Sequence, residues 1–354
     1  MPAGTATSGR ASLRRRVPPA VLILLTAGLT ALVPAPQAAL AASPGVASIS
    51  AGFFHSCALE SGKAYCWGYN YWGQLGNGTT INSSVPVAVD TSGVLAGKTL
   101  TQITTGADHT CALDSAGAAY CWGDNNVGQL GDGSIASSSV PVAVDTSGVL
   151  AGKTLTQITA GRVGHTTCAL DAAGAAYCWG YNFAGQLGDG NTTDSSVPVA
   201  VGTDKTLTQI TAGYAHTCAL DSAGAAYCWG DNSFGELGDG TSGSTTDSSV
   251  PVAVDASGVL AGKTLTQITA GEFHTCAVES GGAAYCWGDD TSGQLGNDST
   301  GAYSVPVAVD TSRPFCMYFP DRHAFLAAWP PSAARCGGRG LPHAGPVTHG
   351  VLAG

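Results

Sequence analysis

The residues of this sequence best suited to chemistry are cysteines and histidines that recur together. Ten of the twelve cysteines form five pairs, and a histidine lies two or three residues before the first cysteine of each pair. The pairs are Cys57 with Cys66, Cys111 with Cys121, Cys168 with Cys178, Cys218 with Cys228, and Cys276 with Cys286. The histidines are His55, His109, His165, His216 and His274. Thiolates and imidazoles are preferred zinc ligands, whereas two neighbouring thiols in an oxidising compartment form a disulfide.

The spacing of the pairs favours disulfides over a metal site. Each pair brackets a short turn signal, such as the one from Asp114 to Gly117, so the two cysteines face each other across a hairpin. Opposed Cα atoms in a non-hydrogen-bonded pair lie about 4.5 Å apart, within the range of about 4.4–6.8 Å for a disulfide. A zinc site needs four ligands, whereas each unit offers three. We therefore predict five disulfides, no metal, no cofactor, and turn-capping hydrogen bonds for the histidines. The pairing of Cys316 and Cys336 stays open.

The cysteine pairs belong to a longer repeat that predicts the fold. A Tyr-Cys-Trp-Gly string occurs five times, with 50 to 58 residues between successive tryptophans: Trp67, Trp122, Trp179, Trp229 and Trp287. The second unit contains four candidate strands, at Leu100–Thr104, His109–Leu113, Ala118–Trp122 and Ser139–Val144. Pro141 indicates that the last of them lies at a sheet edge. Four short antiparallel strands per unit predict an all-β propeller with five complete blades.

The repeated strings resemble a known family. Trp67–Gly76 and Trp179–Gly188 follow the pattern W-G-x-N-x-x-G-Q-L-G, which is similar to the repeat of the regulator of chromosome condensation family. The likeness covers residues 46–310, with Glu236 in place of glutamine and Asp290 in place of asparagine. It implies a β-propeller, and members of that family usually have seven blades. Five units therefore predict a tight ring, an open arc, an assembly of two chains or part of a longer array.

Three segments are expected along the chain. Residues 1–42 have four arginines, the 13-residue apolar run Val21–Val33 and an Ala-Leu-Ala site, which is typical of a secretory signal peptide. The apolar run is shorter than the about 20 residues that span a bilayer, so we expect cleavage and no membrane span. Residues 43–312 form the propeller. Residues 313–354 are an irregular tail, whose abrupt change of composition is typical of a frameshifted or truncated end.

Charge and motif content exclude several functions. Residues 46–310 carry 23 acidic and 6 basic side chains, and such a surface repels nucleic acid. The sequence shows no nucleophile elbow and no His-Glu-x-x-His motif, so we do not expect an enzyme. The turn Asp189–Asp194 has calcium-loop features, but acidic glycine-rich turns are common, so calcium is not predicted.

Differences between the units concentrate in two connections of each blade, the one before the histidine and the one after the Trp-Gly. These are the first and third connections of a four-stranded meander, so strand parity places them on one face. Aromatic and charged residues gather there, as they do in protein-binding hot spots. Any single aromatic could instead pack between blades. The candidate partner contacts are Phe53, Phe54, Tyr69, Tyr71, Trp72, Asp108, Arg162, Tyr181, Phe183, Tyr214, Phe234, Glu272 and Phe273.

Three functions follow as hypotheses. The first is a secreted, non-enzymatic module that binds or inhibits an extracellular or cell-envelope protein through that face. The resemblance supports it, because secreted bacterial propellers similar to this family include β-lactamase inhibitors. The second, implied by the family's founding activity, is guanine-nucleotide exchange on a small GTPase, against which the signal peptide argues. The third is a propeller lyase or hydrolase.

Overall fold

This computed structural model describes residues 45–312. They form twenty β-strands in which apolar and polar residues alternate. The strands form five four-stranded antiparallel sheets, each a simple meander in chain order. We call these sheets blades 1 to 5. The predicted signal peptide at 1–42 and the tail at 313–354 lie outside the described residues, as do Cys316 and Cys336.

The strand bounds repeat closely from blade to blade. Blade 1 comprises β1 (Val46–Ala51), β2 (His55–Glu60), β3 (Lys63–Gly68) and β4 (Ser83–Ala88). Blade 2 comprises β5 (Leu100–Thr105), β6 (His109–Asp114), β7 (Ala119–Gly123) and β8 (Ser138–Ala143). Blade 3 comprises β9 (Leu155–Ala160), β10 (Thr166–Asp171), β11 (Ala176–Gly180) and β12 (Ser195–Ala200). Blade 4 comprises β13 (Leu207–Ala212), β14 (His216–Asp221), β15 (Ala226–Gly230) and β16 (Ser248–Ala253). Blade 5 comprises β17 (Leu265–Ala270), β18 (His274–Glu279), β19 (Ala284–Gly288) and β20 (Tyr303–Ala308).

The four strands predicted in the second unit are confirmed to within one residue at each end. Pro141 lies in β8, which is the last strand of its sheet and therefore an edge strand, as predicted. An edge position suits proline because its missing N–H is not required by a further strand.

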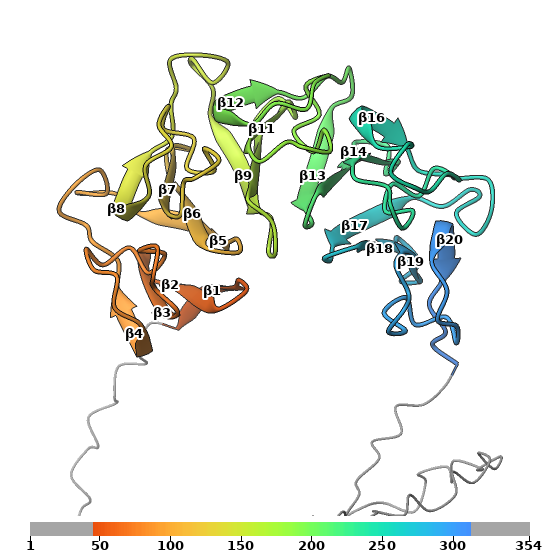
Figure 1. Cartoon of the computed structure of the whole chain (residues 1–354), viewed down its shortest axis with the longest axis horizontal. Helices are drawn as coiled ribbons and strands as arrows, with labels where there is room; N and C mark the ends of the chain where they lie inside the picture. The colour runs from red at the N-terminus through yellow and green to blue at the C-terminus, as the bar shows by residue number, and fades with distance from the viewer. Residues whose placement is uncertain (1–44, 313–354) are drawn as a thin grey trace, which may run out of the picture. The chain divides into compact units, whose positions relative to one another are not determined.

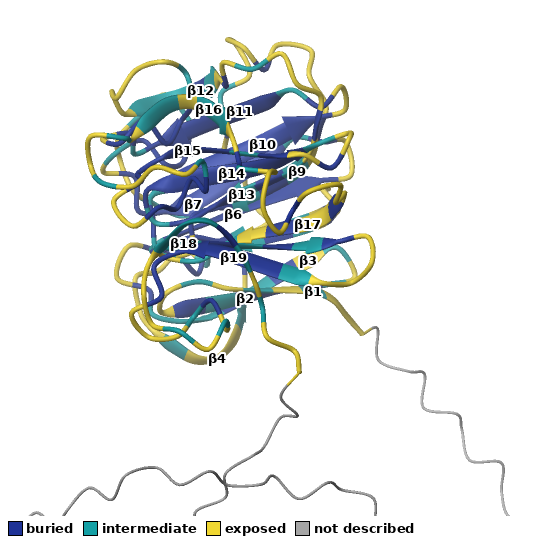
Figure 2. Ribbon diagram, turned by 90° about the vertical axis from the view of Figure 1, so that its right-hand side faces the viewer, coloured by how far each residue is buried: buried dark blue, intermediate teal, exposed yellow. Residues whose placement is uncertain are grey.

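The blades follow one another around an arc, and the first strand of each lies nearest the centre (Figure 1). Each blade packs on the next through the contacts β1 with β5, β5 with β9, β9 with β13 and β13 with β17. The middle strands are the most buried, as Figure 2 shows, and all six residues of both β6 and β10 are buried. The propeller architecture predicted from the repeat is therefore present.

A shared set of residues joins each blade to the next. In the first joint, the main-chain oxygen of Gln74 accepts hydrogen bonds from Trp122 Nε1 (3.0 Å) and Thr110 Oγ1 (2.9 Å). Gly76 lies beneath the same indole, and a Cβ there would come within 2.6 Å of Trp122 Nε1. Equivalent bonds reach the oxygens of Gln129, Gln186 and Glu236 from Trp179, Trp229 and Trp287.

Three of the five histidines, His55, His109 and His216, take part in these joints and do not cap turns, so the turn-capping prediction was wrong for these three. His55 Nε2 lies 2.8 Å from Thr110 Oγ1, and His109 and His216 make the same contact with the next blade at 2.9 and 3.0 Å. The threonine proton goes to the Gln74 carbonyl, so the imidazole Nε2 must be the donor to the hydroxyl. Burial lowers the pKa of His55 to about 4 and that of His109 to about 3, so both rings are neutral at physiological pH.

Five disulfides clamp the second and third strands of the blades, with a Cα–Cα distance of 4.1 Å in each. The pairing register places each cysteine directly opposite its partner. Both cysteines of each pair in blades 1 to 4 are fully buried in the blade cores. All five predicted disulfides are confirmed: Cys57 is bonded to Cys66, Cys111 to Cys121, Cys168 to Cys178, Cys218 to Cys228, and Cys276 to Cys286.

Among the described residues, nothing covers one half of a joint in the first blade and one half in the last. Ile49 of β1 is 67 % exposed, whereas its equivalent in blade 2, Ile103, is 7 % exposed. At the other end, a hollow of about 350 Å³ is lined by Cys276, Val278 and Ala284. Within residues 45–312, no extensive contact links blade 1 to blade 5. The two ends thus present complementary faces of the same joint.

A first prediction concerns the threonine of the joint. Thr167 is fully buried between His109 and the Gln129 carbonyl, so Thr167→Val keeps the shape but leaves the imidazole N–H without an acceptor. We expect a loss of about 1–3 kcal/mol in the free energy of unfolding, measured by urea denaturation. Ser56→Ala is the matched control, because Ser56 holds the same position in blade 1 and no described blade precedes it. Equal losses in both variants would contradict this role.

A second prediction concerns Glu236, which is fully buried where the other blades have glutamine. Its Oε2 accepts a hydrogen bond from Phe234 N (2.8 Å), and burial raises its pKa to about 8. Between pH 4.5 and 8 the folded chain holds this proton and the unfolded chain releases it, so rising pH lowers stability. Glu236→Gln should abolish this slope and add on the order of 2 kcal/mol at pH 8, measured by unfolding at both pH values. A gain that is the same at pH 4.5 and pH 8 would refute the assignment.

Candidate protein-binding face

The first and third connections of every blade lie on one face, which we call the variable face. In blade 1, Tyr69 N donates to the carbonyl oxygen of Phe54 at 2.9 Å. Blades 2 to 5 make the same bond from Asp124 to Asp108, Tyr181 to His165, Asp231 to Ala215 and Asp289 to Phe273. These bonds join the two connections directly, which is the arrangement that strand parity predicts.

A buried asparagine shapes the third connection and fixes which residues point outward. Asn70 is fully buried, and its Oδ1 accepts from Leu75 N at 2.9 Å. Its Nδ2 donates to the carbonyl oxygens of Thr79 and Ile81, at 3.0 Å each. These bonds hold both halves of the loop while Tyr71 and Trp72, which follow the asparagine, stay at the surface. The exposed residues can therefore vary without disturbing the blade.

Blade 1 carries a continuous cluster of five aromatic side chains on this face. Phe53 contacts Phe54 with ring centroids 4.2 Å apart, and Phe54 meets Tyr69 edge-on at 6.0 Å. The series continues from Tyr69 to Tyr71 at 6.4 Å and from Tyr71 to Trp72 at 5.0 Å. Phe54 and Tyr71 are each more than 60 % exposed. The rings therefore pack on one another and leave their outer surfaces in solvent.

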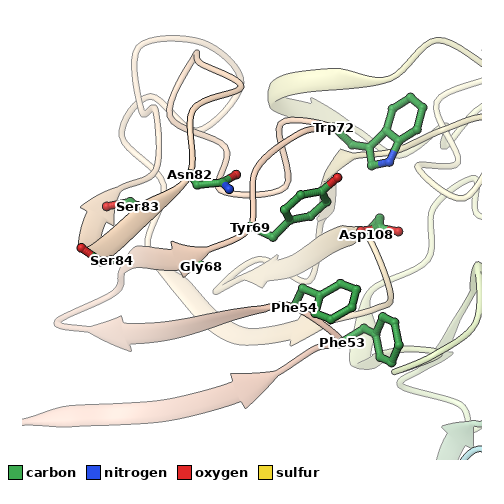
Figure 3. A pocket seen from close by; sticks show the side chains of 9 residues that line it. All are labelled: Phe53, Phe54, Gly68, Tyr69, Trp72, Asn82, Ser83, Ser84 and Asp108. Atoms are coloured by element: carbon green, nitrogen blue, oxygen red, sulfur yellow. The ribbon is translucent and has the colours of Figure 1, made fainter. Parts of the chain in front are cut away.

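The aromatic cluster borders a surface hollow of about 880 Å³ (Figure 3). Its wall also includes Asp108 of blade 2, a half-buried carboxylate that accepts a hydrogen bond from Gln74 Nε2 at 3.1 Å. Burial raises the pKa of Asp108, and the nearby His165 opposes that shift. The hollow thus combines apolar rings with one acidic group, a combination suited to a cationic or aromatic side chain.

Two smaller aromatic groups lie on the variable face of blades 3 to 5. Tyr181 and Phe183 contact each other in blade 3 at 5.1 Å. Phe273 of blade 5 contacts both Tyr214 and Phe234 of blade 4, at 5.5 Å each. The predicted aromatics are thus gathered in three separate groups and not in one continuous ring. Tyr214 and Phe273 also contribute to the packing between two blades.

The predicted charged residues are distributed between these groups. Arg162 and Glu272 are exposed, each in the first connection of its blade. His165 precedes its cysteine as the other four histidines do, but Thr166 takes the strand position opposite Gly180 that histidine holds in the other blades. Two extra residues in this connection displace His165 onto the variable face, where its Nδ1 lies 3.2 Å from Gln129 Nε2 and 3.8 Å from Asp124 Oδ2.

Four residues that line the hollow were missed from the sequence: Gly68, Asn82, Ser83 and Ser84. Asn82 caps the loop through Asn70 N, and Ser83 and Ser84 belong to β4. Gly68 is glycine in all five units, and Ser83 and Ser84 are serine in units 1 to 4, so differences between units give no signal at these positions. Asn82 is replaced by serine or aspartate in units 2 to 4, and this variation was the signal that could have identified it. Among residues 45–312, no group of three or more histidine, cysteine or acidic side chains is placed to hold a metal ion.

The fold and the repeated joint agree with what comparison with known proteins finds. The family model described as RCC1-like domain matches residues 25–329. The chain therefore belongs to the RCC1-like domain family. The regulator of chromosome condensation repeat, inferred from the Trp-Gly strings, is confirmed.

Individual relatives show how far this likeness extends. The chain is 35 % identical to the ultraviolet-B receptor UVR8 of Arabidopsis thaliana over 263 residues, which cover 73 % of this chain and 56 % of UVR8. It is 30 % identical to the E3 ubiquitin-protein ligase HERC2 of Homo sapiens over 78 % of this chain but 6 % of HERC2. A solved structure of Kap60 bound to yeast RCC1 matches with a TM-score of 0.65 and 22 % identity, over 75 % of this chain and 64 % of that chain.

These coverages limit what is transferred from the relatives. The chain spans about half the length of UVR8 and a small part of HERC2, so their activities describe those proteins. The likeness to the solved yeast structure shows the fold. Across residues 45–312, the structure contains no helix long and apolar enough for a membrane crossing.

A third prediction separates packing from binding in the blade 1 cluster. Because Phe54 and Tyr71 are mostly exposed, the double variant Phe54→Ser/Tyr71→Ser should change the free energy of unfolding by less than about 1 kcal/mol. Tyr120→Ala is the contrasting variant, since Tyr120 is 4 % exposed in the core between blades 1 and 2, and should cost about 3–5 kcal/mol. Thermal and urea unfolding of the three proteins would measure both effects. A large loss in the double variant would show that the cluster serves packing.

Proposed function

We propose that this chain is a secreted, non-enzymatic module that binds another protein through the variable face, in the manner of an inhibitor. The observation that carries the proposal is the blade 1 cluster of five contacting aromatic rings, four of which line a hollow of about 880 Å³. Exposed aromatic patches of this kind are typical of interaction sites. The few residues that dominate binding energy at protein interfaces are also enriched in tryptophan and tyrosine.

The chemistry of the face supports a basic partner segment. Asp108 lies in the wall of the hollow, and the surrounding array has 23 acidic and 6 basic side chains over residues 46–310. A lysine or arginine of the partner would meet both the ring faces and the carboxylate. The field of the array would also accelerate the encounter with a positively charged partner. We therefore expect a protein with a basic segment that carries apolar residues beside its charges.

An extracellular location fits the covalent chemistry of the blades. Five disulfides need an oxidising compartment to form and persist. The predicted signal peptide at 1–42 would deliver the chain there. Together these points favour a partner in the culture medium or the cell envelope.

A fourth prediction tests the face by partner capture. The chain should retain a specific protein from culture supernatant or envelope extract, and Phe54→Ser/Trp72→Ser should weaken that binding by at least about tenfold, measured as Kd by surface plasmon resonance. Phe183→Ser tests the blade 3 group in the same way. Raising the salt concentration should slow association, because long-range charge attraction is screened.

The matched control is Val94→Ser/Val149→Ser. Both valines are 41 % exposed and lie in the connections between blades, outside the variable face. This variant should bind the captured protein with unchanged affinity. Equal binding by the control and by the Phe54/Trp72 variant would rule out the blade 1 cluster as the contact.

A further inference from the structure

Blade 5 differs from the other four blades in the loop between β19 and β20. Blades 1 to 4 have asparagine at the loop anchor, whereas blade 5 has Asp290. Blades 1 to 4 also have glycine with a positive φ eight residues after the anchor, whereas blade 5 has Asp298 with φ +65°. Aspartate tolerates this left-handed conformation better than most residues. Two carboxylates therefore enter a single loop whose backbone course is preserved.

The asparagine that Asp290 replaces donates its amide into a group of oxygens. Around Asn70 Nδ2 lie the carbonyl oxygens of Thr79 and Ile81 (3.0 Å each), Thr79 Oγ1 (3.4 Å) and Asn77 Oδ1 (3.5 Å). In the same way, the Nδ2 atoms of Asn125 and Asn182 donate to oxygen atoms of the residues seven, nine and eleven positions later in the chain. The amide is thus surrounded by acceptors in each of these blades.

Asp290 takes the position of the asparagine. Its Oδ1 accepts from Leu295 N at 2.9 Å, and its main-chain oxygen accepts from Gly293 N at 3.0 Å, as Asn70 does with Leu75 and Gly73. The rest of the loop is also built alike. Ser299 N donates to Asn297 Oδ1 at 3.1 Å and Gly301 N to Ser299 Oγ at 3.4 Å, matching 3.2 and 3.4 Å in blade 1.

The consequence is a carboxylate oxygen where the other blades have an amide donor. Asp290 is fully buried, and within the described residues its Oδ2 has no hydrogen-bond partner. Because the loop repeats the hydrogen bonds of blade 1, we expect the oxygens of Asn297, Ser299 and Gly301 near that atom, in the positions that Asn77, Thr79 and Ile81 take around Asn70 Nδ2. A buried carboxylate that faces only acceptors carries a large free-energy cost unless a cation compensates it.

We propose that this loop binds Ca²⁺. Calcium takes six to eight oxygen ligands and accepts carboxylate, carbonyl, side-chain amide and water oxygens in irregular arrangements. Asp290 Oδ2, Asn297 Oδ1 and the carbonyl oxygens of Ser299 and Gly301 provide such a set. Gly301 and Asp298 are both exposed, so water can complete the coordination shell, and Asp298 adds a second negative charge to the loop.

The turn at Asp189–Asp194, which has calcium-loop features in the sequence, lacks this arrangement. Its anchor is Asn182, whose amide satisfies the surrounding oxygens, and Asp194 Oδ1 accepts from Asn182 N at 2.8 Å. Asp189 Oδ2 accepts from Asn191 Nδ2 at 2.7 Å. The change of anchor from asparagine to aspartate therefore distinguishes the blade 5 loop.

A calcium ion here would act on the variable face. Asp289 N donates to the Phe273 carbonyl at 2.8 Å, which ties the loop to the first connection of blade 5. Phe273 in turn contacts Tyr214 and Phe234. The ion would thus stabilise the loop beside the aromatic group shared by blades 4 and 5.

Isothermal titration of the full chain with CaCl₂, after removal of bound metal with EGTA, tests the proposal. We expect one Ca²⁺ per chain with a Kd of about 0.1–1 mM, the range of extracellular calcium modules, and a rise in melting temperature in calcium relative to EGTA. Asp290→Asn should lower the affinity by at least about tenfold. This variant should fold, because asparagine is the anchor of the other four blades.

Two further variants make the test specific. Asp298→Gly, which restores the residue of the other blades, should weaken binding by a smaller factor. Asp189→Asn removes one charge from the corresponding loop of blade 3 and should leave the Kd unchanged. The proposal is overturned if the chain shows no saturable binding up to about 10 mM CaCl₂, or if Asp290→Asn binds as the parent does. It is also overturned if calcium raises the melting temperature of the parent no more than that of Asp290→Asn.

Discussion

One main-chain carbonyl per blade, that of Gln74 and its equivalents, organises the rest of this structure. It accepts the indole N–H and the threonine hydroxyl of the next blade, and in three of the four joints the threonine hydroxyl in turn accepts from a buried histidine. A carbonyl oxygen has two lone pairs, so two donors from the next blade satisfy it completely. The glycine two residues later is required because any side chain at Gly76 would strike Trp122. The joint therefore constrains the course of the backbone, the side-chain contacts and the residue types that these positions accept.

The same loop that supplies this carbonyl also supplies the variable face. Between the buried Asn70 and the buried Gln74 lie three residues, of which Tyr71 and Trp72 are exposed. The inward-facing atoms of this loop make the hydrogen bonds that hold the blade and its neighbour. These bonds do not depend on which side chains stand at the positions of Tyr71 and Trp72. This separation explains how near-identical blades present different surfaces. It also explains the effect of aspartate at the anchor position of Asp290. The amide donor inside the loop is replaced by a carboxylate oxygen, while the course of the backbone is kept.

Much of this arrangement was predictable from the sequence, for physical reasons. Strand alternation, the edge proline and the opposed cysteines are local patterns. The strands, the disulfides and the position of the variable face could therefore be predicted from them. The role of the histidines could not, because the partner of His55 is 55 residues away. In an array where every unit contains histidine, threonine and tryptophan, spacing does not distinguish contacts within a unit from those between units. The hollow beside Phe53 and the burial of Asp290 also depend on how loops from separate segments meet, which no single repeat reveals.

The short span of the disulfides has a consequence for how the chain reaches its fold. Neighbouring units share long stretches of sequence, so a strand of one blade could pair with the equivalent strand of another at little cost in local contacts. Such exchanges are a characteristic error of repeat proteins. The cysteines of each disulfide are 9 or 10 residues apart, and closing so short a loop costs less conformational entropy than bringing together cysteines from different repeats. Oxidation therefore favours pairing of strands from the same hairpin, so the clamps select the correct partner during assembly.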